Sequence, residues 1–322
     1  MWKILSYITK NLVFFIPLSM LLGFVFGLLF DLSFLKKFIL LFTFIMIYPM
    51  MINLKFKKVL EGGDTKVILT AQAINFLFIP FLAYGLGRLF FGENYYLTLG
   101  LLMAGLVPTS GMTISWTGFA KGNVEAAVKM TVIGLILGSL ATPFYVDFLM
   151  SAHLKVDVWY IFRQIIFVVF LPMMAGYLTQ RYLIKKYGPQ KVAKEFSPRF
   201  SGISTLGVLG IVFIAMALKS KDILNQVSLI FYLFLPLFLL YVTNFFIATL
   251  IGKLFFNRGD AIAFVYGTVM RNLSICLAIA MITFGKSHPE VALVIALSFI
   301  IQVQAAAWYV RLSDKIFGPP EK

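Results

Sequence analysis

Long apolar runs, separated by short polar segments, dominate this chain. The length of each run matches the roughly 20 residues that an α-helix needs to cross a bilayer. Ten such runs are present, at 11–30, 34–54, 67–90, 96–119, 123–149, 158–180, 201–218, 226–251, 260–284 and 290–310. A helix satisfies its own backbone hydrogen bonds, which lipid cannot do. The pattern therefore predicts an all-α integral membrane protein with ten transmembrane helices.

Basic residues are distributed unevenly between the predicted loops. With ten spans, the termini and the loops after even-numbered spans share one side, which carries eighteen Lys and Arg residues against seven on the other side. Positive charge accumulates on the cytoplasmic side of membrane proteins. We therefore expect a multi-pass protein of the cell (inner or plasma) membrane with both termini in the cytoplasm. The first run continues to Phe30 without a small-residue cleavage site, so we expect an anchor rather than a signal peptide.

The composition excludes several classes of protein. The chain is 61% hydrophobic and 13% charged, which is far from a soluble domain, and its net charge of +15 is explained by topology and by attraction to anionic membrane lipid. Nucleic acid is not an expected partner. Cys276 has no second cysteine, and both histidines, His153 and His288, fall in predicted loops. We therefore expect no disulfide, no metal site and no cofactor. We also expect no enzyme activity, because no nucleophile and base occur together in a motif.

Two similar segments lie in the third and eighth spans. "NFLFIPFLAYGLGRLFFG" occupies 75–92 and "NFFIATLIGKLFFN" occupies 244–257, and both run from Asn-Phe to Gly-basic-Leu-Phe-Phe. Five spans separate the copies, so they must cross the membrane in opposite directions. Inverted repeats are typical of secondary transporters. We predict two five-helix repeats, 1–150 and 151–322, that form one transporter domain; chance agreement between Phe-rich segments is the alternative.

The fourth span contains residues that interrupt a helix. Pro108 removes a backbone donor and clashes with the preceding turn, while Gly105 and Gly111 loosen the chain on either side. The helix should unwind near 107–112. Irregular backbone at this depth requires cover from protein or a wet cavity. Candidate ligands are therefore Pro108, Thr109, Ser110 and Thr113; a kink without a binding role is the alternative.

The ninth span carries an arginine at its middle. Gly267, Arg271, Asn272 and Ser274 form a polar cluster where a lipid-facing helix would have apolar residues. A charge at the centre of a span costs roughly 2.5 to 3.5 kcal/mol on insertion scales, so such residues usually face a cavity and have a function. The alternative for Arg271 is a structural role, in which it bonds carbonyls freed by an unwound helix.

Three stretches carry a resemblance to a known family. They are "AKGNVEAAVKMTVIGLILGSLATP" at 120–143, "PTSGMTISW" at 108–116 and "MRNL" at 270–273. The chain resembles the bile acid:sodium symporter superfamily over most of its length, and "PTSGM" is similar to the arsenite-permease branch. The resemblance implies ten spans in two inverted five-helix repeats, with helices 4 and 9 broken and crossing at the centre.

The resemblance also implies two sodium sites, and this chain departs from both. The positions of the first site read Thr113, Ile114, Ala127, Thr131 and Gly267, and the side-chain positions of the second read Gly267, Arg271 and Asn75. Sodium requires oxygen ligands, whereas arginine offers five donors and no acceptor. We therefore expect no sodium coupling in the family manner, and we interpret Arg271 as a fixed cation in the place of an ion.

A second basic residue lies inside the fifth span. Lys129 falls between positions 127 and 131 of the first ion site, so it is a candidate for the same role as Arg271. Glu125 is one turn earlier, and an ion pair between residues i and i+4 is the structural alternative. If transport is coupled to protons, these two residues are the leading candidates.

The sequence thus predicts a secondary active transporter that moves a small organic anion by alternating access. The first alternative is a permease that exports arsenite or a related metalloid, although Thr109 stands at the position of that branch's thiol. A sodium-coupled bile-acid-type symporter is a weaker alternative, and a sensor that does not transport is another. The candidate substrate- and ion-binding residues are Asn75, Pro108, Thr109, Ser110, Thr113, Lys129, Thr131, Arg271, Asn272, Ser274 and Gln302.

Overall fold

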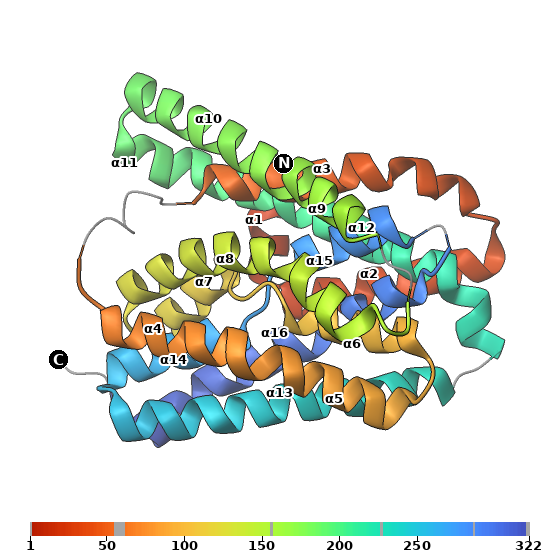
Figure 1. The fold of residues 1–322 in the computed structure, drawn as a ribbon. Coiled ribbons are helices and arrows are strands. Elements are labelled where there is room, and N and C mark those ends of the chain that lie inside the picture. Colours follow the sequence, from red (N-terminus) through yellow and green to blue (C-terminus); the bar gives the residue numbers. More distant parts are fainter. Residues whose placement is uncertain (1, 55–61, 155–156, 226–227, 286, 320–322) are drawn as a thin grey trace. The chain divides into compact units, whose positions relative to one another are not determined.

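The protein is helical wherever its structure is described. This computed structural model describes residues 2–54, 62–154, 157–225, 228–285 and 287–319 (Figure 1). Seven described helices are long and apolar enough to cross a membrane, namely Ser33–Ile52, Thr65–Phe91, Val124–Met150, Trp159–Tyr187, Pro189–Leu218, Phe231–Phe255 and Glu290–Phe317. Shorter apolar helices cover Phe14–Leu29, Tyr95–Gly105 and Leu273–Thr283. The all-α membrane class is confirmed.

Ten spans were predicted and seven long helices are described, and a local cause explains two of the three differences. The predicted spans without a long helix are the first, the fourth and the ninth. The fourth is divided into α6 (Tyr95–Gly105) and α7 (Gly111–Phe119), and the ninth into α14 (Arg258–Val269) and α15 (Leu273–Thr283). Each piece is shorter than a bilayer-spanning helix. The ten-span inverted repeat stays a prediction.

The chain forms two compact units. The first unites Met1–Leu54, Asp157–Leu229 and Ser274–Ala296, and the second unites Lys55–Val156, Ile230–Leu273 and Leu297–Lys322. Each unit contains segments from both halves of the sequence. The division into compact units therefore differs from the predicted division into repeats. The predicted repeats 1–150 and 151–322 remain untested by this division.

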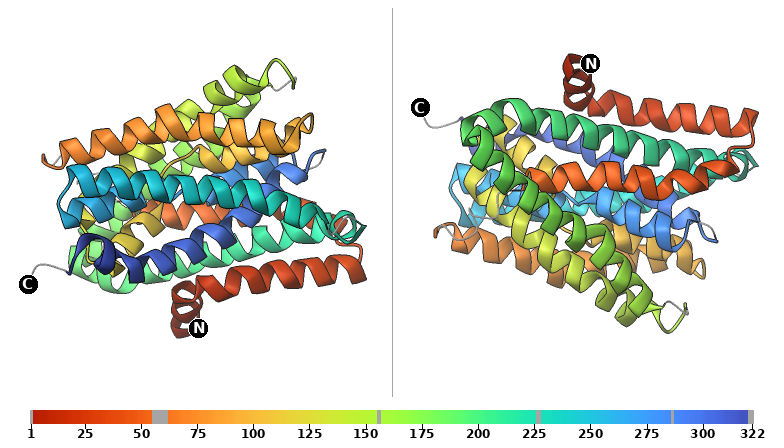
Figure 2. Two further views of the ribbon diagram at one scale, coloured as in Figure 1. Left: turned by 90° about the horizontal axis from the view of Figure 1, so that it is seen from below. Right: turned by 90° about the horizontal axis from the view of Figure 1, so that it is seen from above.

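The first unit is built around one long helix. Its elements include α1 (Trp2–Lys10), α2 (Leu12–Leu29), η1 (Ser33–Phe38), α3 (Ile39–Ile52), α9 (Val158–Ile165), η4 (Ile166–Phe170), α10 (Leu171–Tyr187), α11 (Pro189–Lys191), η5 (Val192–Phe196) and α12 (Ser197–Asn225). Helix α12 packs against α2 and α3 (Figure 2). A Cβ atom on Gly23 or Gly27 would lie 2.4 Å from the carbonyl oxygen of Phe213 or Ala217. This glycine pair therefore lets α2 approach the backbone of α12.

The second unit contains both halves of the divided fourth span. Its other elements are α4 (Thr65–Ala73), the π-helical segment η3 (Ile74–Phe78), α5 (Ile79–Phe91), α8 (Val124–Met150), α14, and most of α13 (Ser228–Phe255) and α16 (Glu290–Phe317). Helix α8 packs against α4, α6, α7 and α14. Asparagine N-caps fix where three helices begin: the side chains of Asn94, Asn123 and Asn257 accept hydrogen bonds from Leu97 N, Ala126 N and Asp260 N.

The predicted unwinding of the fourth span is confirmed, with a small shift in its bounds. Helix α6 ends at Gly105 and α7 begins at Gly111, so the interruption covers 106–110 instead of 107–112. Thr109 has a φ of 65°, in the left-handed region that non-glycine residues rarely occupy. The helix resumes earlier than predicted because Ser110 caps α7 and Gly111 is its first residue.

Candidate substrate and ion site

The interruptions of the fourth and ninth spans pair through their backbones. The backbone N–H of Thr109 donates to Met270 O over 2.7 Å, and that of Asn272 donates to Val107 O over 2.8 Å. These bonds form an isolated antiparallel bridge between Pro108 and Arg271. Proline has no N–H to contribute, so both bonds come from residues beside the bridged pair. The bridge brings four of the predicted site residues together: Pro108, Thr109, Arg271 and Asn272.

Helix α8 provides a surface of small residues for the interruption. A Cβ atom on Gly134 would lie 2.6 Å from the Thr109 hydroxyl, and one on Gly138 would lie 2.4 Å from Pro108 Cδ. The Thr109 hydroxyl, which is fully buried, lies within hydrogen-bonding distance of the carbonyl oxygens of Pro108, Met130 and Thr131, at 2.6, 3.2 and 3.3 Å. Thr109 stands at the position where the arsenite-permease branch has a thiol. Its hydroxyl is within hydrogen-bonding distance of backbone carbonyls of α8 and of the bridge.

Arg271 bonds the ends of both divided helices. Its guanidinium donates from Nη1 to Leu106 O over 3.5 Å and from Nη2 to Thr268 O, and the residue is 2% exposed. Leu106 directly follows α6, and Thr268 belongs to the last turn of α14. The last carbonyls of a helix lack intrahelical partners and carry partial negative charge. The buried cation of Arg271 thus lies at two negative helix ends.

Gln302, from α16, fixes the backbone of this arginine. Its Oε1 accepts from Arg271 N over 2.8 Å and from the Tyr241 hydroxyl over 3.1 Å. Its Nε2 donates to Arg271 O over 3.2 Å. Both groups of the amide therefore bond the interrupted chain. Gln302, a candidate site residue from the sequence, lies at this site.

Two asparagines bond consecutive carbonyls at the end of α14. Asn75 Nδ2 donates to Gly267 O over 3.0 Å, and Asn244 Nδ2 donates to Thr268 O over 2.9 Å. Their amide oxygens are buried without a hydrogen-bond partner in the described part of the chain. Asn244 was not among the candidate residues predicted from the sequence, although it begins the second copy of the repeated segment just as Asn75 begins the first.

The space beside Gly267 is occupied by a side chain. A Cβ atom on Gly267 would lie 2.6 Å from the sulfur of Met130, so this thioether lies where the resemblance implies a carboxylate. The nearby helix-end carbonyls are bonded by Arg271, Asn75 and Asn244. Over the described ranges, no three His, Cys, Asp or Glu residues gather in a way that could hold a metal ion. This donor set does not fit a sodium ion.

The start of α7 is the most open part of the site. Ser110 and Thr113 form a capping box: Ser110 Oγ accepts from Met112 N, and Thr113 Oγ1 accepts from Ser110 N. Gly111 is exposed, and nothing lies within 4 Å of a Cβ atom built on it. Thr131 lies nearby, with its hydroxyl 3.4 Å from Ser110 O. Ser274 is half-buried and belongs to the first compact unit.

Lys129 belongs to a second polar cluster. Its ammonium lies 2.8 Å from Gly62 O, 2.9 Å from Asp64 Oδ2 and 3.3 Å from Glu125 Oε1, and the residue is 2% exposed. The contact between Lys129 and Glu125 is the i, i+4 ion pair that the sequence analysis weighed against an ion-site role. Asp64 was not expected, because it precedes the third span and is 65 residues from Lys129.

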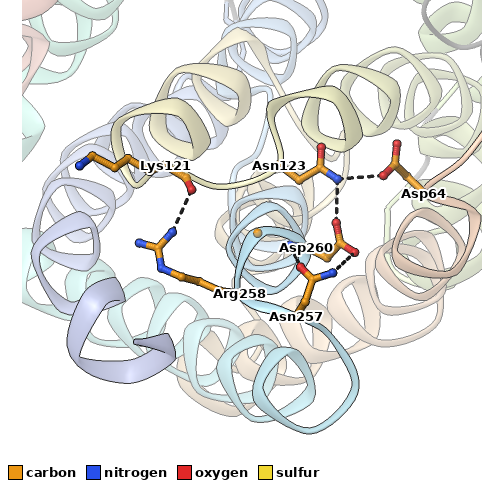
Figure 3. A pocket seen from close by; sticks show the side chains of 7 residues that line it. Asp64, Lys121, Asn123, Asn257, Arg258 and Asp260 are labelled. Atoms are coloured by element: carbon orange, nitrogen blue, oxygen red, sulfur yellow. Dashed lines mark hydrogen bonds between the residues drawn. The ribbon is translucent and has the colours of Figure 1, made fainter. Parts of the chain in front are cut away.

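Asn123 connects this cluster to the start of α14. Its Nδ2 donates to Asp64 Oδ1 over 2.8 Å and to Asp260 Oδ1 over 2.7 Å, and Asn257 donates to the other oxygen of Asp260 (Figure 3). These side chains line a cavity of about 560 Å³ together with Lys121, Arg258 and Gly259. One amide therefore links the starts of α4, α8 and α14.

Comparison with known proteins establishes the family. The model described as "Sodium Bile acid symporter family" matches residues 39–226, which is more than half of the chain. The chain belongs to the sodium bile acid symporter family. This family consists of transporters and permeases, so the protein is a multi-pass membrane transporter. That agrees with the expectation that it is not an enzyme.

Relatives within the family differ in what their names state. The chain is 28% identical to the uncharacterized protein YbaS of Bacillus subtilis, over 69% of this chain and 71% of that protein. It is 24% identical to the arsenical-resistance protein Acr3 of Alkaliphilus metalliredigens, over 84% of this chain and 79% of the relative. It is 25% identical to the sodium/bile acid cotransporter 7 of Rattus norvegicus, over 61% and 58%.

Proposed function

We propose that this transporter moves a small organic anion by alternating access and is not coupled to sodium in the manner that the family resemblance implies. The observation that carries the proposal is the buried guanidinium of Arg271 on the carbonyls of Leu106 and Thr268. Ten spans in two inverted repeats, in a plasma membrane with cytoplasmic termini, are the architecture that we propose with it.

The arginine opposes a sodium ion both by chemistry and by charge. Arginine has no acceptor, and the carbonyls at the helix ends already have donors from Arg271, Asn75 and Asn244. Two unit charges about 4 Å apart repel by roughly 4 kcal/mol at an effective dielectric constant of about 20. A repulsion of this size corresponds to a loss of roughly a thousandfold in affinity.

The start of α7 is the place that we propose for the anion. Helix N-termini carry partial positive charge and free N–H groups, which suit a carboxylate or similar group. The space beside Gly111, the first residue of α7, is open. Arg271 adds positive potential, because it is bridged to Pro108, two residues before Ser110 in the chain. Aromatic residues make up 16% of the chain and can supply apolar walls for an organic body.

Protons are the coupling ion that we propose if transport is driven by an ion. Glu125 and Lys129 remain the candidate groups, and Asp64 joins them because it bonds the same ammonium. Lys129→Gln should then abolish the pH dependence of transport in a protein that still folds. An unchanged pH profile in this variant removes Lys129 from the coupling mechanism.

A thermal-shift screen followed by counterflow tests the proposed function. The purified protein is heated with small organic anions, arsenite or bicarbonate, with and without sodium at fixed ionic strength, because a ligand stabilises the folded state by mass action. We expect an organic anion to raise the melting temperature equally in both salts, and the same anion to show counterflow in vesicles. A stabilisation that requires sodium, or binding without counterflow, contradicts the proposal.

Arsenite export is the second candidate, because the arsenical-resistance relative aligns over 84% of this chain. The position of the branch's thiol holds Thr109, whose hydroxyl is bonded within the protein. A hydroxyl is not a soft ligand for arsenic. Arsenite resistance conferred on cells that lack their own efflux permease would place this candidate first.

A further inference from the structure

The turn between α10 and α12 concentrates positive charge. Residues 181–199, called the basic turn below, contain one acidic residue, Glu195, whose carboxylate lies 3.9 Å from Arg199. Figure 1 shows this turn where α10 meets α11. Its six basic residues are Arg181, Lys185, Lys186, Lys191, Lys194 and Arg199, of which all but Arg199 are exposed. The charge of the basic turn is therefore far from balanced within the turn itself.

Two ammonium groups of the basic turn share one aromatic ring. Lys186 Nζ lies 5.2 Å from the centre of the Tyr187 ring, and Lys191 Nζ lies 5.8 Å from the same centre. Gly188, with a φ of 80°, turns the chain so that Lys191 returns to Tyr187. Two like charges near one ring repel each other, and an anion bound close to them offsets that repulsion. A cavity of about 420 Å³ lies beside this ring, and it is lined by Tyr187, Gly188, Pro189, Gln190 and Lys191.

Aromatic rings accompany three of the six basic residues, Lys186, Lys191 and Arg199. Lys186 also lies 5.7 Å from the Tyr182 ring, and the Arg199 guanidinium lies 5.5 Å from the ring of Trp2 and 5.7 Å from that of Phe196. Trp2 belongs to α1, which packs against α12. Tyrosine, tryptophan and basic residues occur together where membrane helices reach the headgroup level. The basic turn comprises the end of one candidate membrane span, Trp159–Tyr187, and the start of the next, Pro189–Leu218.

We propose that the basic turn binds the phosphate headgroup of an anionic membrane phospholipid. Lys191 receives the phosphate in the cavity beside Tyr187, Lys186 adds positive charge from the same ring, and the exposed rings contact the upper part of the acyl chains. A free phosphate would use the same ammonium groups but would leave the exposed faces of Tyr182 and Trp2 without a partner. The proposal concerns the first compact unit and does not depend on the transported substrate.

Reconstitution into nanodiscs of defined lipid tests this site. The melting temperature is measured in phosphatidylcholine alone and in phosphatidylcholine that contains a minority of phosphatidylglycerol, and bound lipid is measured by native mass spectrometry. We expect phosphatidylglycerol to raise the melting temperature and to remain bound. The double variant Lys186→Gln with Lys191→Gln should bind it about 25-fold more weakly, because each basic residue near an anionic surface contributes about fivefold.

The matched control removes the same charge from another part of the same unit. Lys36→Gln with Lys37→Gln changes two neighbouring lysines of η1 and should retain the full effect of phosphatidylglycerol. Gln190→Glu, which places a carboxylate in the cavity, should weaken binding without removing any contact of the two lysines. An equal effect of phosphatidylglycerol on the parent and on both cavity variants overturns the proposal. So does a stabilisation that inorganic phosphate reproduces in phosphatidylcholine discs.

Discussion

Replacing Arg271 by Gln removes a buried charge while it keeps a polar side chain. The guanidinium now bonds Leu106 O and Thr268 O, from the two divided helices. Thr268 O also accepts from Asn244 over 2.9 Å, so it retains one donor in the variant. Leu106 O loses its bond from Arg271. The effect of Arg271→Gln therefore reports the contribution of the charge more than that of the hydrogen bonds.

The expected loss of stability in Arg271→Gln follows from these contacts. A hydrogen bond to a charged group contributes about 1.5 to 3 kcal/mol, and we assign one such bond to the change because the second carbonyl is still satisfied. If the same charge supplies the positive potential for the anion, binding should weaken by a similar free energy, which is roughly 10- to 150-fold. Lys at 271 should recover part of this loss, since it restores charge but not the planar fork of donors.

Binding of the anion found in the thermal-shift screen is the appropriate assay, measured by titration in detergent with and without sodium. Asn244→Leu is the matched control, because it removes the other donor to Thr268 O and leaves the charge in place. We expect the control to lower the melting temperature but to bind the anion as the parent does. The double variant Gly267→Glu with Arg271→Gln restores a carboxylate and removes the opposing charge, so its binding should respond to sodium.

One result would refute this reasoning. If Arg271→Gln is well folded, binds the anion with the affinity of the parent and transports it at the same rate, then the arginine only holds loose backbone. The idea of a fixed cation in an ion's place is then wrong, although the bridge and its contacts remain as described.

Substitutions at two positions of the second unit and one test of the native chain give further predictions. Lys129→Met should lower the melting temperature because the carboxylate of Asp64, only 17% exposed, loses its ammonium partner; adding Asp64→Leu should recover more than half of the loss in the same thermal assay. Gly138→Ala should destabilise by about 1 to 3 kcal/mol, since its Cβ would lie 2.4 Å from Pro108 Cδ, whereas Gly85→Ala meets no neighbour and should be neutral in thermal denaturation. Expression of the native chain should not protect efflux-deficient cells from arsenite in a growth assay, and protection that does not require Thr109→Cys would contradict the preference for an organic anion.

The interruptions were predictable because their causes are local. Pro108 and the glycines beside it act on their own helix, and an arginine within an apolar span signals an unusual environment without any knowledge of its neighbours. The i, i+4 pair of Glu125 and Lys129 follows from helix geometry in the same way. These features required only the sequence within a few residues.

The partners of these residues were less predictable because they come from distant segments. Asp64 and Asp260 accept from Asn123 across separations of 59 and 137 residues, and no periodicity indicates such a contact. Met130 beside Gly267 was missed for the same reason. Asn244 is the exception, because it begins the second repeated segment just as the candidate residue Asn75 begins the first.

The bridge between the two interruptions has a consequence for how such transporters change during evolution. Its bonds join Thr109 N to Met270 O and Asn272 N to Val107 O, so they depend on main-chain atoms alone. Position 272 must not be proline, and position 109 must also tolerate a φ of 65°. The bonds of the bridge therefore do not depend on which side chain stands at 271, so an exchange of an ion's ligand for an arginine at that position leaves these two bonds possible. The backbone bridge fixes the position of a charge, and the side chains determine whether that charge is a bound ion or a residue of the chain.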